Sequence, residues 1–581
     1  MQIKRFTTSV GVVLIVIMAL LLWRILYLQS SRTDYYQQRS QKQRQSTVVY
    51  TSQRGLIVDR NNNMLAASNL IETVFVEPRA IIGDPELVKI TAAKLQNILS
   101  IPGTQICDLI YKSRNPGYLA LKTGITPNLH QAVRQAGLRG VAIQSNWQRY
   151  YPTGSLMSHV VGFTGKDNTG LAGLEFKYNE KLSAHFGKDV LIVDSSRKPI
   201  AAKNYPNTPE DGSSLILTID STIQQFVRKA LLKQYKDFNA ESATAIVMDP
   251  WTGAILAMVS LPDFDASEIS SSKPHQRRNR ALTDPFEPGS IFKPIVAALA
   301  LDCGSITKDQ VFFCENGNYH GKGFGSIGEW ANHKYGNMTV HDILVRSSNI
   351  GMAKIGQKMG RKKLHKGIKL FGFGRRTGID LPGEDAGLVR NVSKWDGYSV
   401  TRIPYGHEVS VTSLQIISAY ATLANGGSPV TPHLVRAVID NQGQITEMNI
   451  PPRLSGHIIK PEIANWIARK ALVAVVNDKK GTGKNAAIEK WQVFGKTGTA
   501  NISRANVKGY DESNYVASFA GGAPADNPAI VALVSIRKPD KSLRKGYSGG
   551  RVAAPVFKEI VENTLNYLEL ERQRQLLASS Y

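Results

Sequence analysis

The stretch Glu287-Pro288-Gly289-Ser290-Ile291-Phe292-Lys293-Pro294 carries the strongest signal in this 581-residue chain. Its Pro-Gly pair predicts a turn, and the apolar run 295–301 predicts a buried helix. Ser290 then stands at a helix N-terminus, with Lys293 one turn later on the same face. A serine hydroxyl becomes a strong nucleophile when a base takes its proton. A lysine serves as that base when burial or a neighbouring cation lowers its pKa.

Two further short motifs follow along the chain. Ser347-Ser348-Asn349 begins 57 residues after Ser290, and Lys496-Thr497-Gly498-Thr499 begins 149 residues after Ser347. A Ser-x-x-Lys pair alone is more often a capping serine beside a solvated lysine, and the other two motifs alone are equally weak. The three in this order are typical of serine enzymes that react with penicillin.

The chemistry of such a set predicts a role for each catalytic residue. Ser347 relays a proton between Ser290 and the leaving group. Asn349 holds Lys293 and the substrate amide. Lys496 supplies the cation that lowers the pKa of Lys293 and attracts a substrate carboxylate.

The rest of the third motif predicts substrate binding by Thr497, Gly498 and Thr499. Gly498 lets the substrate backbone lie against the strand. The N–H of Thr499, together with the N–H of Ser290, forms an oxyanion hole, and the positive end of the helix favours the same oxyanion.

The chain resembles a class B penicillin-binding protein, a peptidoglycan D,D-transpeptidase, of the division-specific type known as penicillin-binding protein 3. The resemblance covers nearly the whole chain. Besides the three motifs, the family-like stretches are 54–60 with 65–66, 151–162, 170–175, 248–253, 279–281, 371–374, 377–384, 411–415, 523–528 and 549–557.

Two positions depart from the family pattern. Ser348 stands at the middle of the second motif, where the Ser-Asp-Asn form of this motif has Asp, and the segment Gly406-His407-Glu408 stands where relatives often carry a second glycine. The first departure leaves Ser347 and Asn349 intact. The second leaves the shape of the local loop open.

The resemblance implies an α+β fold. The expected transpeptidase domain is an antiparallel sheet flanked by helices, on an elongated N-terminal pedestal of the class B dimerisation type, with one N-terminal transmembrane helix. The expected parts are a cytoplasmic tail (1–5), a transmembrane anchor (6–28), the pedestal (29–235), the transpeptidase domain (236–570) and a C-terminal tail (571–581).

The anchor is also visible in the residues. Lys4 and Arg5 precede a run that is uncharged from Val10 to Trp23, and 6–28 is long enough for one membrane-spanning helix. A cleaved signal peptide would need a shorter core and a small-residue cleavage site, whereas bulky residues follow here. Positive charge flanks both ends, so charge alone leaves the orientation open.

The implied activity is cross-linking of peptidoglycan stem peptides. Ser290 attacks the carbonyl between two terminal D-alanines, and the acyl group then passes to the amine of a neighbouring stem. β-Lactams are expected to acylate Ser290, and the resulting acyl-enzyme is expected to hydrolyse slowly. No metal or organic cofactor is needed. This chemistry implies an inner-membrane, single-pass protein with a cytoplasmic N-terminus and a periplasmic or extracellular catalytic domain.

The expected partners follow from the same resemblance. Beyond stem peptides and lipid-linked glycan strands, they are a polytopic glycan polymerase of the SEDS family beside the single helix and division activator proteins on the pedestal. The net charge of +25 agrees with an anionic neighbour, whether nucleic acid, headgroups or an acidic polymer. The basic run 273–280 lacks interleaved aromatic residues, which argues against nucleic acid. The histidines show no metal-ligand spacing.

Other readings stay open at this point. An elongation-type class B enzyme is the nearest alternative, and the stretch 371–384 and the overall length favour division. A β-lactamase or β-lactam sensor shares the three motifs, but no deacylation base is recognisable. A non-catalytic division scaffold would not need Ser290 and Lys293. Cys303 and Cys314 are close enough in sequence to form a disulfide or to stay as two thiols.

Overall fold

The computed structural model describes residues 2–30, 32–50, 52–185, 187–193, 199–203, 210–449, 456–503 and 510–579. The chain forms two units, which are 1–53 with 184–212 and 54–183 with 213–581.

The first unit contains the apolar helix. Within α1 (Gln2–Ser30), the segment Phe6–Ser30 has 25 residues and a mean hydropathy of 2.6, which is long and apolar enough to cross a membrane. It is consistent with a single-pass anchor. Helix α2 (Thr33–Arg44) follows. An antiparallel sheet of three strands is formed by β1 (Gln45–Tyr50), β6 (Gly187–Val193) and β7 (Pro199–Lys203).

The second unit is built around a five-stranded antiparallel sheet with the strand order β10-β9-β19-β18-β17. Its strands are β9 (Ser242–Met248), β10 (Ile255–Leu261), β17 (Phe494–Ser503), β18 (Tyr510–Ala523) and β19 (Ile530–Arg537). Every residue of β9 and β10 is buried. Because successive side chains of a strand point to opposite faces, both faces of the sheet are covered.

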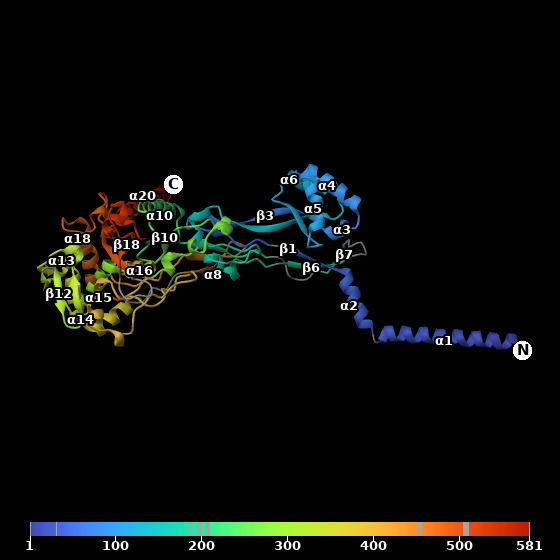
Figure 1. Cartoon of the computed structure of the whole chain (residues 1–581), viewed down its shortest axis with the longest axis horizontal. Helices are drawn as coiled ribbons and strands as arrows, with labels where there is room; N and C mark the ends of the chain where they lie inside the picture. The colour runs from blue at the N-terminus through green and yellow to red at the C-terminus, as the bar shows by residue number, and fades with distance from the viewer. Residues whose placement is uncertain are drawn as a thin grey trace. The chain divides into compact units, whose positions relative to one another are not determined.

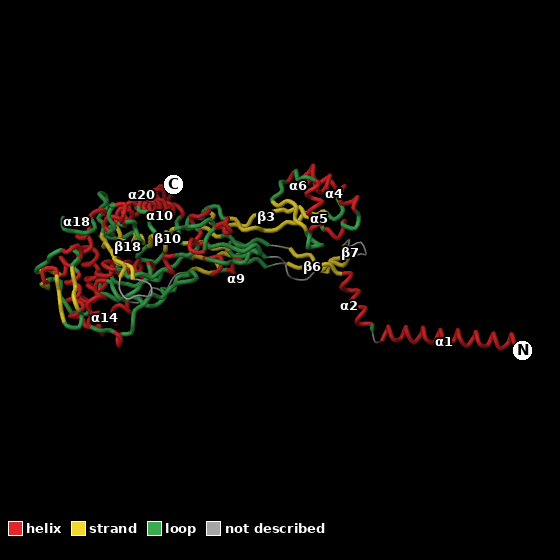
Figure 2. Tube along the Cα trace, in the orientation of Figure 1, coloured by secondary structure: helices red, strands yellow, loops and turns green. Residues whose placement is uncertain are grey.

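Helices cover the two faces. Helices α10 (Ser221–Asp237) and α20 (Ala554–Ser579) contact each other and the strands β10 and β18 (Figure 1). Helices α16 (Ser413–Ala424) and α18 (Leu472–Asn477) contact β19 and β17. In Figure 2, β18 lies between α18 and the pair α10 and α20. This confirms the expected antiparallel sheet flanked by helices.

The helices that carry the motifs pack beside α16. Helix α12 (Lys293–Asp302) contacts α14 (Asn349–Leu370) and α16, and α13 (Val340–Val345) leads into α14. Nine of the ten residues of α12 are buried, from Lys293 to Leu301. The apolar run after Ser290 therefore forms the predicted buried helix, beginning at Lys293.

The N-terminal part of the second unit is a second sheet with an appended helical lobe. The sheet order is β16-β15-β8-β2-β3-β4, and β5 also pairs with β3. Its strands are β2 (Ile57–Val58), β3 (Met64–Val76), β4 (Leu119–Thr123), β5 (Val141–Tyr150), β8 (Ser214–Leu217), β15 (Val435–Ile439) and β16 (Ile445–Met448). The helices α4 (Pro85–Leu99), α5 (Gly103–Lys112) and α6 (Pro127–Ala136) share a core with β3.

A buried ion-pair cluster holds this part together. Glu175 accepts hydrogen bonds from Arg54 Nε and Arg149 Nε, each at 2.6 Å, and all three side chains are almost fully buried. Arg54 also donates to the Asn168 carbonyl and to Asn179. Removing one member of such a cluster leaves an uncompensated buried charge.

Two of the expected boundaries differ from the packing. Helix α10 begins at Ser221, before the expected start of the transpeptidase domain at residue 236, and its residues Ile223, Val227 and Leu231 share a core with the catalytic sheet. This packing argues for an earlier start. Residues 571–579, expected as a tail, continue α20 to Ser579. Cys303 is exposed, Cys314 is buried, and both are free thiols.

Candidate active site

Ser290 lies in a tight turn that enters α12. The turn (Gly289–Phe292) is a single 3-10 turn, and Gly289 has φ +57°. The Gly289 N–H donates to the Gly406 carbonyl at 3.0 Å. The Tyr420 hydroxyl, fully buried, donates to the Ile291 carbonyl at 2.9 Å. These contacts hold the backbone on both sides of the Ser290 side chain.

Lys293 connects the first motif to the second. Its side chain is fully buried. Nζ donates to Asn349 Oδ1 at 2.8 Å, to the Ser347 carbonyl at 2.6 Å and to Ser347 Oγ at 3.2 Å. Burial lowers the pKa of Lys293 to about 7, and the nearby Glu329 carboxylate opposes that shift. A large fraction of Lys293 is therefore neutral near physiological pH. A lysine must be neutral to act as a general base.

Lys496 lies fully buried on β17. Its Nζ donates to the Thr497 carbonyl at 3.3 Å. Burial lowers the pKa of Lys496 well below its ordinary value, and repulsion from Lys293 adds to the effect. We expected Lys496 to lower the pKa of Lys293. The main cause for each lysine is desolvation, because both ammonium groups lie away from water.

The second motif adopts a strained conformation. Ser347 has φ +61°, in the left-handed region that non-glycine residues rarely occupy. Ser348 caps α14, with its Oγ accepting from the Gly351 N–H at 3.0 Å. The side chain of Ser348 donates to Glu329 Oε1 at 2.5 Å. Such strain persists only where surrounding contacts hold it.

Glu329 is the functional residue that sequence reasoning missed. It lies nearly buried at the N-terminus of α14, where Oε2 accepts from the Asn349 N–H at 2.7 Å and Oε1 from the Ile350 N–H at 3.2 Å. The carboxylate is thus matched to the positive end of the helix. Through Ser348 and Asn349 it fixes the second motif. Its segment carries no recognisable motif, so the sequence offered no signal for it.

Gly498 has a packing role on β17. A Cβ at this position would lie 2.3 Å from Ser518 Oγ, 3.0 Å from Ile291 Cγ2 and 3.2 Å from the Pro288 carbonyl. Glycine here lets the turn that carries Ser290 approach the strand. The expected contact between Gly498 and substrate backbone stays a prediction.

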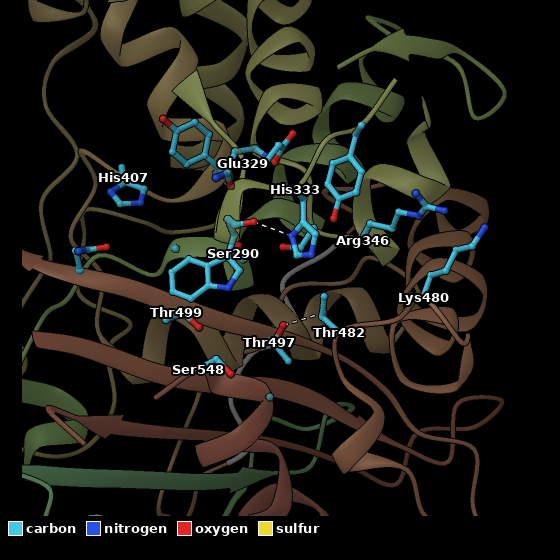
Figure 3. Close-up of a pocket in the computed structure, with 18 residues that line it drawn as sticks. Ser290, Glu329, His333, Arg346, His407, Lys480, Thr482, Thr497, Thr499 and Ser548 are labelled. Atoms are coloured by element: carbon cyan, nitrogen blue, oxygen red, sulfur yellow. Dashed lines mark hydrogen bonds between the residues drawn. The ribbon is translucent and has the colours of Figure 1, made fainter. Parts of the chain in front are cut away.

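The motifs meet at one cavity of about 460 Å³ (Figure 3). Of the predicted site residues, those that line it are Ser290, Ser347, Asn349, Thr497 and Thr499. Lys293, Lys496 and Gly498 are not among the lining residues. Thr497 Oγ1 donates to Thr482 Oγ1 at 2.9 Å, and the Gly549 N–H donates to Thr499 Oγ1 at 3.0 Å. Within the described ranges, no three His, Cys, Asp or Glu side chains gather as metal ligands.

The segment 406–408, which departs from the family pattern, contributes His407 to the wall of the cavity. The Nδ1 of His407 lies 3.0 Å from Glu287 Oε2. Glu408 has φ +59°, which explains why a glycine suits this position. The Glu408 carboxylate is held by Arg390 and by Ser399 Oγ, the latter at 2.8 Å.

Gly406→Ala should weaken both the fold and the acylation of Ser290. Gly406 has φ +88°, and its Cβ would lie 2.1 Å from the Gly289 carbonyl oxygen. We expect a loss of about 2–5 kcal/mol in the free energy of unfolding from strain and overpacking. Displacement of the Ser290 turn should slow acylation by up to about 10²-fold. Urea unfolding and penicillin labelling rates measure the two effects.

Gly378→Ala is the matched control. Gly378 also has φ +88°, but its Cβ would have no neighbour within 4 Å. It should lose only the conformational cost of about 1–2 kcal/mol and keep its acylation rate. Equal effects of the two substitutions would contradict the steric argument.

A serine at a helix N-terminus, a buried neutral lysine bonded to a Ser-x-Asn turn, and a Lys-Thr-Gly strand together define an active-serine acyltransferase. Residues 49–217 match the family model of the penicillin-binding protein dimerisation domain, and residues 243–562 match that of the penicillin-binding protein transpeptidase domain. The chain belongs to the penicillin-binding protein family, as a class B, serine-type peptidoglycan D,D-transpeptidase.

Curated relatives match along nearly the whole chain. Stage V sporulation protein D of Bacillus subtilis is 32% identical over 92% of this chain and 81% of its own. The probable peptidoglycan D,D-transpeptidase PenA of Neisseria gonorrhoeae is 30% identical over 100% of this chain and 96% of its own. The peptidoglycan D,D-transpeptidase FtsI of Escherichia coli K12 is 28% identical over 98% of this chain and 92% of its own.

Solved structures of similar proteins have the same fold. A peptidoglycan synthetase from Bifidobacterium adolescentis superposes with a TM-score of 0.71 at 25% identity, covering 90% of this chain and 97% of its own. Penicillin-binding protein 3 of Mycobacterium tuberculosis, in complex with aztreonam, superposes with a TM-score of 0.68 at 26% identity and the same coverage.

Proposed function

We propose that this chain cross-links peptidoglycan stem peptides at the division septum through an acyl-enzyme on Ser290, and that β-lactams inhibit it by acylating the same serine. The observation that carries the proposal is the bonding of buried Lys293 to Ser347 and Asn349 beside the cavity that Ser290 lines. This arrangement supplies a base, a proton relay and a substrate-facing nucleophile in one place.

In the proposed reaction, neutral Lys293 takes the proton of the Ser290 hydroxyl as Oγ bonds to the D-alanine carbonyl carbon. The C–N bond to the terminal D-alanine then breaks, and Ser347 passes the proton to the leaving amine. An acceptor amine next attacks the ester carbon, the C–Oγ bond breaks, and the proton returns to Ser290. The N–H groups of Ser290 and Thr499 hold the oxyanion in both steps.

The state of Glu329 favours a transpeptidase over a β-lactamase. A β-lactamase needs a carboxylate or other base free to activate water for deacylation. Among the described residues that line the cavity, Glu329 carries the carboxylate, and its oxygens accept from Ser348 Oγ and from the backbone N–H groups of Asn349 and Ile350. Because these three donors already occupy its oxygens, the Glu329 carboxylate is poorly placed to bind and activate a water molecule.

The division role, the location and the partners are part of the proposal. The stretch 371–384 and the chain length favour a division enzyme over an elongation-type one. The apolar segment Phe6–Ser30 supports an inner-membrane anchor. Transpeptidation outside the cytoplasm then requires a cytoplasmic N-terminus. From the family resemblance we also expect a SEDS-family polymerase beside the helix and activators on the pedestal. A fluorescent fusion should concentrate at the septum. A signal along the lateral wall would favour the elongation alternative.

Asn61→Ala tests whether the pedestal switches the active site. Asn61 Nδ2 donates to Asp220 Oδ2 at 3.0 Å and to the Tyr567 hydroxyl at 3.3 Å, which joins the turn after β2 to α10 and α20. In a complex reconstituted with the glycan polymerase, transpeptidation should fall by about 2- to 30-fold while penicillin acylation is kept. Asn97→Ala, an exposed change on α4, is the control. Equal loss of both activities would contradict a switching role.

A further inference from the structure

Two cationic side chains line one end of the active-site cavity. Arg346 directly precedes Ser347, and Lys480 lies in the turn before Thr482. Figure 3 shows both at the end opposite His407, with Ser290 between. Within the described part of the chain, neither the Arg346 guanidinium nor the Lys480 ammonium takes part in an ion pair or a side-chain hydrogen bond.

The Arg346 guanidinium is held by aromatic stacking. Its Cζ lies 5.7 Å from the centre of the Tyr335 ring. Tyr335 is stacked on His333 at 5.6 Å, and His333 Nδ1 lies 2.7 Å from the Trp330 carbonyl oxygen. Stacking positions a guanidinium while leaving its N–H groups unused. An oriented guanidinium with unused donors is suited to bind a carboxylate with two parallel hydrogen bonds.

The neighbouring acidic groups are already engaged. Glu329 accepts hydrogen bonds at the N-terminus of α14, and Asp478 Oδ1 accepts from the backbone N–H of Lys480 at 2.6 Å. Lys496, which was also expected to attract a substrate carboxylate, is fully buried and does not line the cavity. Among the described residues that line the cavity, Arg346 and Lys480 are therefore the arginine and lysine side chains that a bound substrate reaches.

The position of these cations next to Ser347 places them on the amine side of the reaction. Ser347 passes the proton to the leaving amine in the proposed function. Attack by an acceptor amine is the chemical reverse of that departure, so the acceptor enters where the D-alanine leaves. The nitrogen of that D-alanine is bonded to a carbon that bears a carboxylate. The space beside Ser347 must therefore accommodate an amine on a carboxylate-bearing carbon once per turnover.

We propose that Arg346 and Lys480 form a carboxylate subsite that selects acceptors whose nucleophilic amine stands on a carbon bearing a free carboxylate. The inference rests on the proposed function and adds the substrate class. A D-configured α-amino acid centre in the acceptor stem satisfies the subsite. An amine at the end of a plain alkyl chain, or one beside an amidated carboxylate, does not.

The test compares two acceptors on the full chain in detergent micelles. Ser290 is acylated by an N-acetyl-D-alanyl thioester of benzyl mercaptan, whose leaving group is uncharged. D-Alanine and D-alaninamide are then offered at equal concentration, and mass spectrometry measures the two products. Comparing the product ratio of each variant with that of wild type cancels the difference in amine basicity. It also cancels any partial loss of folded enzyme.

Wild type should favour D-alanine. Arg346→Gln and Lys480→Gln should each lower the ratio of D-alanine to D-alaninamide product by about tenfold, because each removes a charged hydrogen-bond donor. Lys479→Gln removes the same charge one residue from the cavity and should change the ratio by less than about twofold. Lys480 is exposed, so its variant tests the subsite even if Arg346→Gln unfolds.

Three results would overturn the inference. The first is an unchanged ratio in Lys480→Gln, whether or not Arg346→Gln folds. The second is an equal fall in Lys479→Gln, which would indicate a diffuse field instead of a subsite. The third is a wild type that favours D-alanine no more than the uncatalysed reaction of the same thioester does. Absence of any acyl-enzyme, with thioester or with penicillin, would instead overturn the proposed function and the inference with it.

Discussion

Ser290→Ala should abolish covalent labelling by a fluorescent penicillin, whereas wild type should form a label that lasts for hours. The alanine variant lacks the Oγ that bonds to the β-lactam carbonyl carbon, so no other motif residue compensates for it. The Ser290 side chain makes none of the hydrogen bonds found among the described residues. The variant should therefore stay within about 0.5 kcal/mol of wild type in its free energy of unfolding.

The measurement is gel fluorescence over several hours, with thermal melting beside it to show that each variant is folded. Ser271→Ala, at the exposed end of the 3-10 helix Ala266–Ser271, is the control and should label like wild type. A label that forms and decays within minutes would favour a β-lactamase. Folded wild type without label would favour the scaffold reading and remove Ser290 from the mechanism.

The acylation rate of wild type should fall about tenfold for each pH unit below about 7, because only neutral Lys293 accepts the Ser290 proton. The sign follows from the lowered pKa. Above about pH 7 the Lys293 amine is mostly neutral and can accept the Ser290 proton. Below about pH 7 it is mostly protonated and cannot. Stopped-flow measurement of the second-order rate constant with penicillin, from pH 5.5 to 9, gives the profile.

Lys293→Met removes the base and keeps an apolar chain of similar length in the buried position. Acylation should fall by about 10²- to 10⁴-fold and lose this ionisation. The carbonyl of Ser347 and Oδ1 of Asn349 lose their donor, at a cost of about 1–3 kcal/mol. Lys358→Met, an exposed position of α14, controls for loss of a charge. A flat profile between pH 6 and 8 in wild type would contradict the role of Lys293.

Local patterns predicted the elements that carry the chemistry. The turn at Pro288-Gly289 followed by an apolar run indicated the buried helix α12. Likewise, the apolar runs 243–248 and 254–259 on either side of the turn 249–253 form the antiparallel pair β9 and β10. These predictions succeed because a turn residue and the spacing of apolar side chains act over a few neighbours.

The meeting of the motifs and a lowered pKa for Lys293 were expected, whereas the main cause of that shift and the nearby carboxylate were not. The pKa of Lys293 depends on how completely α12 is covered, and the nearby carboxylate comes from Glu329, 36 residues further along the chain. Desolvation and charge act through space, so spacing along the chain does not reveal them. The same holds for Gly498, whose missing Cβ makes room for a turn more than 200 residues earlier.

The sequence by itself predicted the nucleophile, its order relative to the two later motifs, and the apolar N-terminal segment, because covalent chemistry and helix formation depend on residue type and short-range spacing. Only the tertiary structure decided that burial lowers the pKa of Lys293 and that Glu329 holds the second motif. It also decided that, among the described residues, Arg346 and Lys480 are the arginine and lysine side chains open to the cavity. Burial, hydrogen bonding and charge exposure arise when distant segments exclude water together.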